Sequence, residues 1–111
     1  MGKYEMYKDA GGGYRFRLKA GNGQIILASE SYVRKAGVEG GIQSVKVNSP
    51  TDSRYERKQA SNGQYMFNLK AANHEIIGTS ELYTSSASRE NGIESCKENG
   101  PDSPIVDLTG E

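Results

Sequence analysis

An internal repeat constrains the fold of this chain more than any other feature of its sequence. Residues 4–50 align with residues 55–101 at a constant shift of 51 positions and without a gap, and 22 of the 47 aligned pairs are identical. A repeat of this length is typical of two copies of one supersecondary unit that pack together around a common core. We therefore expect both halves of the chain to adopt the same fold.

The composition indicates that neither copy is stable by itself. Only 34% of the residues are hydrophobic, and the chain contains 14 Gly and no Trp. A single copy of about 50 residues with so few apolar side chains buries too little surface to fold alone. We therefore predict one domain over residues 1–111, in which two intertwined repeats (about 3–53 and about 54–108) merge their cores. Because the two copies satisfy each other, we also expect a monomer.

Within each copy, the pattern of side chains predicts three strands followed by a helix. Apolar or aromatic residues alternate with basic ones along residues 14–19, and a period of two is typical of a strand with one buried face. The aromatic side, formed by Tyr14, Phe16 and Leu18, is identical in the second copy, whereas the basic side changes. We therefore expect the aromatic side to face the core and the basic side to face solvent.

Sparse apolar stripes predict helices near residues 34–47 and 85–98, and residues 105–108 are predicted to form one further short strand. The predicted fold class is α+β: two tandem β3-α(-β) repeats that share one antiparallel sheet, with both helices on one face and a pseudo-two-fold axis between the copies. Gly41 and Gly92 fall inside the two helices, which implies a close approach of each helix to the sheet.

Asparagines that recur in both copies are expected to mark turns and helix ends. Asn22 and Asn73 fall between the second and third predicted strands, where Asn tolerates a left-handed backbone better than most residues. Asn48 and Asn99 stand where a left-handed residue would end each helix, two positions before a proline. Left-handed backbone is therefore expected at these asparagines.

Three short motifs recur in the two copies. In the first copy they are Phe16-x-Leu18-Lys19-Ala20-x-Asn22, Ser29-Glu30-x-Tyr32, and Gly41-Ile42-x-Ser44-Val45 with Asn48-x-Pro50. Together they resemble the YegP-like family of small bacterial proteins, over about residues 3–108. The resemblance implies β3-α-β units, as tandem repeats or as two subunits, in one antiparallel sheet with exchanged C-terminal strands. It brings no catalytic residues, because the family is known as a domain of unknown function.

The charges are balanced over the whole chain but not between its halves. The formal net charge is zero, which argues against a protein that finds a phosphate backbone by long-range attraction. Residues 1–53 carry eight Lys or Arg and five Asp or Glu, whereas residues 54–111 carry six and nine. The resulting +3 and −3 indicate either mild attraction between the halves or a basic surface on the first repeat for an anionic partner.

The sequence offers no pattern typical of a metal site or of a nucleophile. Cys96 is the only cysteine, and its counterpart Val45 indicates a buried apolar position. His74 is the only histidine, and its counterpart is Gly23. We therefore expect no metal, no cofactor and no disulfide. No segment is long and apolar enough to span a membrane, so a cytoplasmic location without membrane association is the expectation.

Two hypotheses about function remain open. In the first, the protein is a small non-catalytic interaction module that binds a protein or an anionic partner through the face of the sheet that the helices leave open. That face is predicted to carry Glu5, Tyr7, Arg15, Arg17 and Lys19. Charge reversal of both arginines should then abolish binding and leave the fold intact. Nucleic-acid binding is not expected, because Tyr14 and Phe16 are predicted to point inward rather than to stack on bases.

In the second hypothesis, polar residues that recur in both copies form a site for a small ligand or a reaction. The set consists of Lys19 and Lys70, Glu30 and Glu81, and Tyr32 and Tyr83. The structural alternative is a pair of cross-strand ion pairs, Lys19–Glu30 and Lys70–Glu81. A concave pocket around these groups would favour the catalytic interpretation.

Overall fold

The structure is a computed structural model and describes residues 2–111. Each repeat contains three strands and a helix, as the sequence predicts. Repeat 1 consists of β1 (Lys3–Lys8), β2 (Tyr14–Lys19), β3 (Ile25–Ala28) and α1 (Lys35–Asn48). A single 3-10 turn (Asp52–Arg54) leads to repeat 2, which consists of β4 (Tyr55–Gln59), β5 (Tyr65–Lys70), β6 (Ile76–Thr79) and α2 (Ser86–Asn99). The predicted last strand is β7 (Ile105–Asp107).

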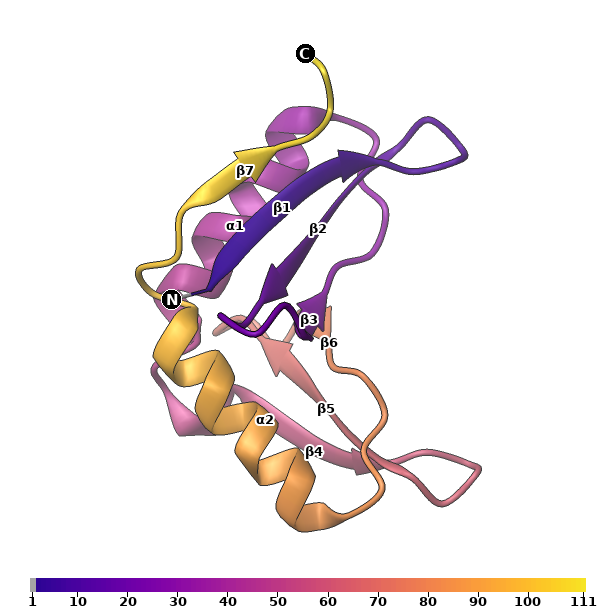
Figure 1. The fold of residues 1–111 in the computed structure, drawn as a ribbon, viewed down its shortest axis with the longest axis vertical. Coiled ribbons are helices and arrows are strands. Elements are labelled where there is room, and N and C mark those ends of the chain that lie inside the picture. Colours follow the sequence, from indigo (N-terminus) through magenta and orange to yellow (C-terminus); the bar gives the residue numbers. More distant parts are fainter. Residues whose placement is uncertain (1) are drawn as a thin grey trace.

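All seven strands form one sheet in the order β4-β5-β6-β3-β2-β1-β7. The two repeats meet at its centre, where Ala28 of β3 pairs with Thr79 of β6. Figure 1 shows the resulting pseudo-symmetry, with the β1–β2 and β4–β5 hairpins projecting from opposite ends of the sheet. Buried side chains of both repeats, among them Phe16, Phe67 and Ile93, belong to one hydrophobic cluster between the sheet and the two helices.

One strand pair departs from the predicted antiparallel sheet. β7 runs parallel to β1 along its outer edge, with Tyr4 opposite Ile105 (Figure 1). The cause lies at the end of α2, which is held beside the start of β1: the Tyr4 hydroxyl donates to the Gly100 carbonyl at 2.6 Å. The chain therefore enters β7 from the same end at which β1 begins and runs in the same direction. The sheet is mixed, and the expectation of a purely antiparallel one is wrong.

The two repeats exchange equivalent contacts across the pseudo-two-fold axis. Tyr55, the counterpart of Tyr4, donates its hydroxyl to the Ser49 carbonyl at 2.7 Å, so the first strand of each repeat is tied to the end of the other repeat's helix. Ser49 and Gly100 are themselves counterparts, and both are buried. A Cβ atom on Gly100 would collide with the side chain of Ser49. Only one member of this pair can therefore carry a side chain.

The expectation of left-handed asparagines in the hairpin turns is wrong by one residue. Positive φ values occur at Gly23 (85°) and His74 (71°), which directly follow the two asparagines. The asparagine side chains shape the turns instead, because Oδ1 of Asn22 and Oδ1 of Asn73 each accept a hydrogen bond at 3.0 Å from the backbone N–H two residues later.

The helix ends also differ from the prediction. Ser49 and Gly100 follow the last helical residues with φ of −59° and −57°, so neither helix ends in a left-handed residue. The amide groups of Asn48 and Asn99 donate to the carbonyls four residues earlier, at 2.8 and 2.9 Å. Their Oδ1 atoms accept hydrogen bonds from Arg54 and from the backbone of Gly2, where the other repeat begins. These side chains therefore join helix ends to neighbouring segments.

The close approach at the two helix glycines involves tyrosine side chains. A Cβ atom on Gly41 would lie 2.6 Å from the Tyr32 hydroxyl oxygen, and one on Gly92 would collide with the Tyr83 hydroxyl. Each tyrosine follows the third strand of its repeat and fills the space under the helix. Among residues 2–111, no helix has the length and apolar character required to cross a membrane.

Candidate functional site

The open face of repeat 1, opposite the helices, brings together the basic residues of the first hypothesis. In the antiparallel register of β1 and β2, Glu5 lies opposite Arg17 and Tyr7 lies opposite Arg15. Lys3 lies opposite Lys19. The alternate residues Tyr4, Met6, Phe16 and Leu18 are buried in the core. We call the cluster of Lys3, Glu5, Tyr7, Arg15, Arg17 and Lys19 the repeat-1 open face.

Glu5 is the centre of this face and is nearly buried, with 9% of its side chain exposed. The Arg17 Nε atom lies 2.6 Å from its carboxylate, Lys19 Nζ lies 3.1 Å away and Lys3 Nζ lies 3.5 Å away. The hydrogen bond from Arg17 is the main reason why the pKa of Glu5 is lowered to about 2, and Lys19 adds to it. Arg17 also stacks over the Tyr7 ring, 4.4 Å from its centroid.

This geometry changes the interpretation of Arg17. A glutamate at position 17 would place a second carboxylate against the nearly buried Glu5, where like charges repel strongly. Charge reversal at Arg17 is therefore expected to disturb the sheet, contrary to the expectation from the sequence. Lys3 and Lys19 are the two cations in contact with Glu5 that can be neutralised while Glu5 keeps its shortest contact, the one with Arg17.

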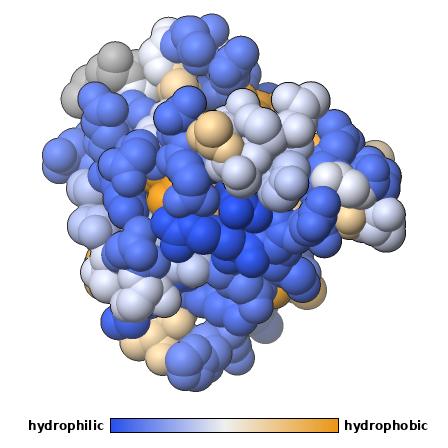
Figure 2. All heavy atoms as spheres, turned by 90° about the horizontal axis from the view of Figure 1, so that it is seen from below, coloured by the Kyte–Doolittle hydropathy of each residue, from blue (hydrophilic) through white to orange (hydrophobic). Residues whose placement is uncertain are grey.

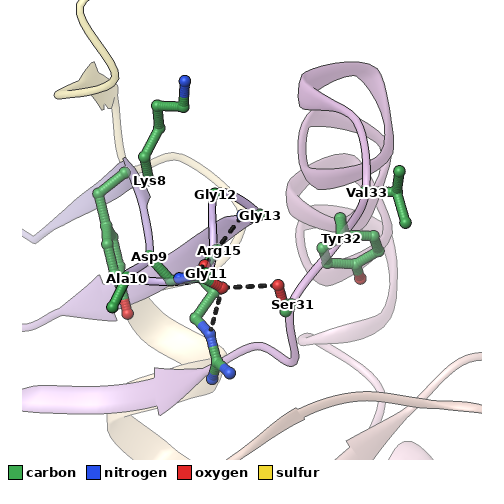
Figure 3. A pocket seen from close by; sticks show the side chains of 11 residues that line it. Lys8, Asp9, Ala10, Gly11, Gly12, Gly13, Arg15, Ser31, Tyr32 and Val33 are labelled. Carbon is green, nitrogen blue, oxygen red and sulfur yellow. Dashed lines mark hydrogen bonds and ion pairs between the residues drawn. The ribbon is translucent and has the colours of Figure 1, made fainter.

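At the outer end of the same face, the β1–β2 hairpin forms an open cleft with the segment that precedes α1. The cleft has a volume of about 1030 Å³ and is lined by residues 7–13, Arg15 and residues 31–33. We call it the hairpin cleft. It contains three residues that the sequence proposed for binding, Tyr7, Arg15 and Tyr32. Figure 3 shows the Asp9 carboxylate joined to Arg15 and Ser31, with Tyr32 and Val33 farther along the segment that leads to α1.

Asp9 is held by four hydrogen bonds. One carboxylate oxygen accepts from the backbone N–H groups of Gly11 and Gly13, at 3.0 and 2.9 Å. The other oxygen accepts from the Ser31 hydroxyl at 2.6 Å and from Arg15 Nε at 3.1 Å. The Ser31 and Arg15 hydrogen bonds, in that order, lower the pKa of Asp9 to about 2. The carboxylate therefore stays ionised over the usual pH range and fixes the position of Arg15.

The residues of the second hypothesis are not gathered in this way. The carboxylate partner of Lys19 is Glu5, and that of Lys70 is Glu56 at 2.9 Å. The ion pairs expected from the sequence, with Glu30 and Glu81, are therefore replaced by pairs to the first strand of each repeat. Glu30 and Glu81 are exposed. Tyr32 and Tyr83 lie partly buried under the helices, and this burial raises the pKa of both phenols.

Repeat 2 offers a built-in comparison, because the same face carries different side chains there. Arg15 and Arg17 are replaced by Met66 and Asn68, and only Lys58 and Lys70 are basic on this face of β4 and β5. On the helix side, Arg57 bonds to Glu90 and Asp52.

Figure 2 views the molecule from the end at which α2 begins, and that surface is mostly hydrophilic with apolar residues in separate places.

The single histidine and the single cysteine lie apart from both surfaces. His74 is an exposed turn residue between β5 and β6. Cys96 is fully buried in α2, and burial raises the pKa of its thiol to about 11. Ser29 and Ser80 accept hydrogen bonds from the backbone of Phe16 and Phe67, each at 2.9 Å. Within residues 2–111, no group of three or more His, Cys, Asp or Glu side chains is arranged to hold a metal ion.

Sequence reasoning missed Asp9, Ser31 and Val33 as parts of the cleft. A signal was present, because the second copy has Ala60, Leu82 and Thr84 at these positions although the hairpin backbone is the same. Positions at which two copies of one fold differ are therefore where side chains with a role beyond the shared backbone can be sought.

Comparisons with known proteins agree with the architecture. The family described as "Domain of unknown function (DUF1508)" matches the chain twice, over residues 9–56 and 60–107. A relative named UPF0339 protein from Acinetobacter baylyi is 57% identical over 109 residues, which cover 98% of each chain. UPF0339 protein YegP from Escherichia coli K12 is 53% identical over 108 residues, 97% of this chain and 98% of the relative.

A solved structure extends the agreement to the fold. The solution NMR structure of a UPF0339 protein from Shewanella oneidensis matches with a TM-score of 0.93 at 53% identity, and the match covers 99% of this chain and 93% of that one.

Proposed function

We propose that this chain, which belongs to the DUF1508 family as a tandem-repeat member, is a non-catalytic interaction module that binds a negatively charged partner protein through the repeat-1 open face. The family brings no activity with it, because these relatives are uncharacterised proteins. The proposal therefore rests on the side chains of this chain alone.

One observation carries the proposal: four of the eight cations of repeat 1 share one face of the sheet and exceed its carboxylates. Lys3, Arg15, Arg17 and Lys19 share this face with Glu5, and Asp9 neutralises Arg15 from the adjacent turn. Four positive charges thus meet two negative ones within one cross-strand cluster. Repeat 2 builds the same sheet with only two cations on this face of β4 and β5, Lys58 and Lys70, against Glu56. A cluster that the fold does not require, with one sign of charge in excess, favours an anionic partner.

The positions of the reactive side chains support a binding role over a catalytic one. A catalytic acid, base or nucleophile needs a partner within hydrogen-bonding reach. Cys96 is buried with a raised thiol pKa, and His74 lies in an exposed turn. The lysines of the second hypothesis are paired with Glu5 and Glu56. No observation favours a second candidate function.

A pair of matched double variants tests the proposal. Lys3→Gln with Lys19→Gln removes two charges from the repeat-1 open face and leaves Glu5 with Arg17. Lys58→Gln with Lys70→Gln removes two from the same face of repeat 2, and Lys19 and Lys70 have similar exposed fractions, 24% and 26%. Both variants and the unmodified protein are used as bait for affinity purification from native cell extract, followed by mass spectrometry at two salt concentrations.

The proposal predicts an acidic protein that the unmodified bait and the Lys58/Lys70 variant both retain, that the Lys3/Lys19 variant loses, and that high salt releases. Retention of the same proteins by both variants, or loss with both, would contradict it. We further propose that the protein acts as a monomer in the cytoplasm. Sedimentation at micromolar concentration should give the 12.1 kDa mass of one chain, and cell fractionation should place the protein with cytoplasmic markers.

A further inference from the structure

The hairpin cleft differs between the repeats although its backbone does not. In both hairpins a backbone hydrogen bond closes the turn, from Asp9 to Gly13 at 2.9 Å and from Ala60 to Gln64 at 2.7 Å. The glycine before the last turn residue has a φ of 84° in repeat 1 and 86° in repeat 2. Repeat 2 makes this turn without an aspartate, an arginine or the serine. The Asp9–Arg15–Ser31 cluster is therefore additional to what the fold requires.

The cluster holds the guanidinium group of Arg15 in a fixed position and leaves its two terminal nitrogens without a hydrogen bond to residues 2–111. Arg15 uses Nε to bond Asp9, and Asp9 is fixed by the two glycine N–H groups and by Ser31. Among residues 2–111, the terminal nitrogens of Arg15 make no hydrogen bond, and Asp9 is the one ion-pair partner of Arg15. Its side chain is 43% exposed. A guanidinium that is oriented before binding loses less entropy when it takes a planar anion through two parallel hydrogen bonds.

The walls of the cleft are partly apolar. Val33 belongs to the lining and is 90% exposed. Tyr7 lies opposite Arg15 in the register of β1 and β2, and Tyr32 borders the cleft in the segment that leads to α1. A cationic floor beside aromatic and aliphatic walls suits a ligand with an anionic head and an apolar body.

We propose that the hairpin cleft binds a carboxylate group carried next to an aromatic or aliphatic side chain, and that Arg15 receives this carboxylate through its two terminal nitrogens. The proposal rests on the proposed function, because it assigns to the cleft a defined part of the anionic partner. The carboxylate can come from the C-terminus of a peptide or from an acidic side chain, since both present the same two oxygens.

Three short peptides separate these sources in NMR titrations of the complete isotope-labelled protein. They are N-acetyl-Gly-Phe as the free acid, the same peptide as the C-terminal amide, and N-acetyl-Phe-Glu as the C-terminal amide. We expect at least one of the two acidic peptides to bind with a dissociation constant of about 1 mM. Its shifts should centre on the amides of residues 11–13 and 31–33. The equivalent residues 62–64 and 82–84 should not respond, and neither should any residue to the neutral peptide.

Variants identify the contact with Arg15. Arg15→Met introduces the residue that repeat 2 has at this position, and Arg15→Gln keeps a polar side chain if the first variant disturbs the hairpin. Each should weaken binding of the acidic peptide about tenfold or more, whereas Lys58→Gln should leave it unchanged. The proposal is overturned if the neutral peptide binds equally well, if neither acidic peptide binds, or if both Arg15 variants bind as tightly as the unmodified protein.

These outcomes can be told apart from failure of the proposed function. If the partner retained in the affinity purification depends on Lys3 and Lys19 while no acidic peptide enters the cleft, the interaction module stands and the assignment of the cleft is wrong.

Discussion

Replacement of Glu5 by glutamine tests the nearly buried charge cluster at the centre of the repeat-1 open face. The pKa of Glu5 is lowered from 4.5 to about 2, mainly by the hydrogen bond from Arg17. A shift of this size corresponds to about 3 kcal/mol between the ionised and neutral forms. Solvent still reaches Arg17 and Lys19, so we expect Glu5→Gln to lower the free energy of unfolding by about 1–2 kcal/mol at pH 7.

The pH dependence of this effect follows from the direction of the shift. A carboxyl group with a lowered pKa in the folded state stabilises the fold above its unfolded pKa, near 4.5, and loses this contribution as the pH falls toward 2. The stability difference between the unmodified protein and Glu5→Gln should therefore be full at pH 7 and close to zero at pH 2. Urea unfolding followed by circular dichroism at several pH values measures it.

Glu56→Gln provides the control at the equivalent position of repeat 2. Glu56 also accepts hydrogen bonds, from Asn68 and Lys70, but 37% of its side chain is exposed. Its replacement should cost less than that of Glu5. Equal losses for the two variants, or a loss for Glu5→Gln that stays constant between pH 7 and pH 2, would refute the reasoning.

Three further predictions concern the core and the turns. Gly100→Ser should lower the free energy of unfolding by about 2 kcal/mol, because the new side chain collides with Ser49. The double variant Ser49→Gly with Gly100→Ser should recover most of this loss. No recovery in thermal denaturation would show that the two sites do not meet. His74→Gly should raise stability by about 0.5–1 kcal/mol, because His74 has a φ of 71°; a lower melting temperature would argue against strain at this turn. Cys96 should resist a thiol reagent at pH 8 until the protein unfolds, because burial raises its pKa to about 11; rapid labelling of the folded protein would contradict its burial.

The features that the sequence predicted correctly depend on local geometry. Alternation along β2 assigned Phe16 and Leu18 to the core because successive side chains of a strand point to opposite faces. The comparison of the two copies also placed Cys96 in the core because its counterpart is the apolar Val45, and the structure buries both residues fully. Both inferences needed only the chain's own periodicity or its internal alignment.

The features that the sequence did not predict depend on where distant segments meet. The partner of Lys19 is Glu5 because the register of β1 and β2 puts Lys19 opposite Lys3, next to the Glu5–Arg17 pair, and no pattern within one strand fixes that register. The direction of β7 depends on where α2 ends relative to β1. The hairpin cleft required Ser31 to reach Asp9 across 22 positions of sequence.

The central claim is that the two repeats share one core and unfold together. Native-state hydrogen exchange of the Ile93→Ala variant tests it most directly, because Ile93 lies in α2 of repeat 2 and is fully buried. Loss of this side chain should lower the free energy of exchange by about 2–4 kcal/mol, by the same amount at the protected amides of β2 in repeat 1 and of β5 in repeat 2. A loss confined to β5, with β2 unchanged, would mean that the repeats are independent units.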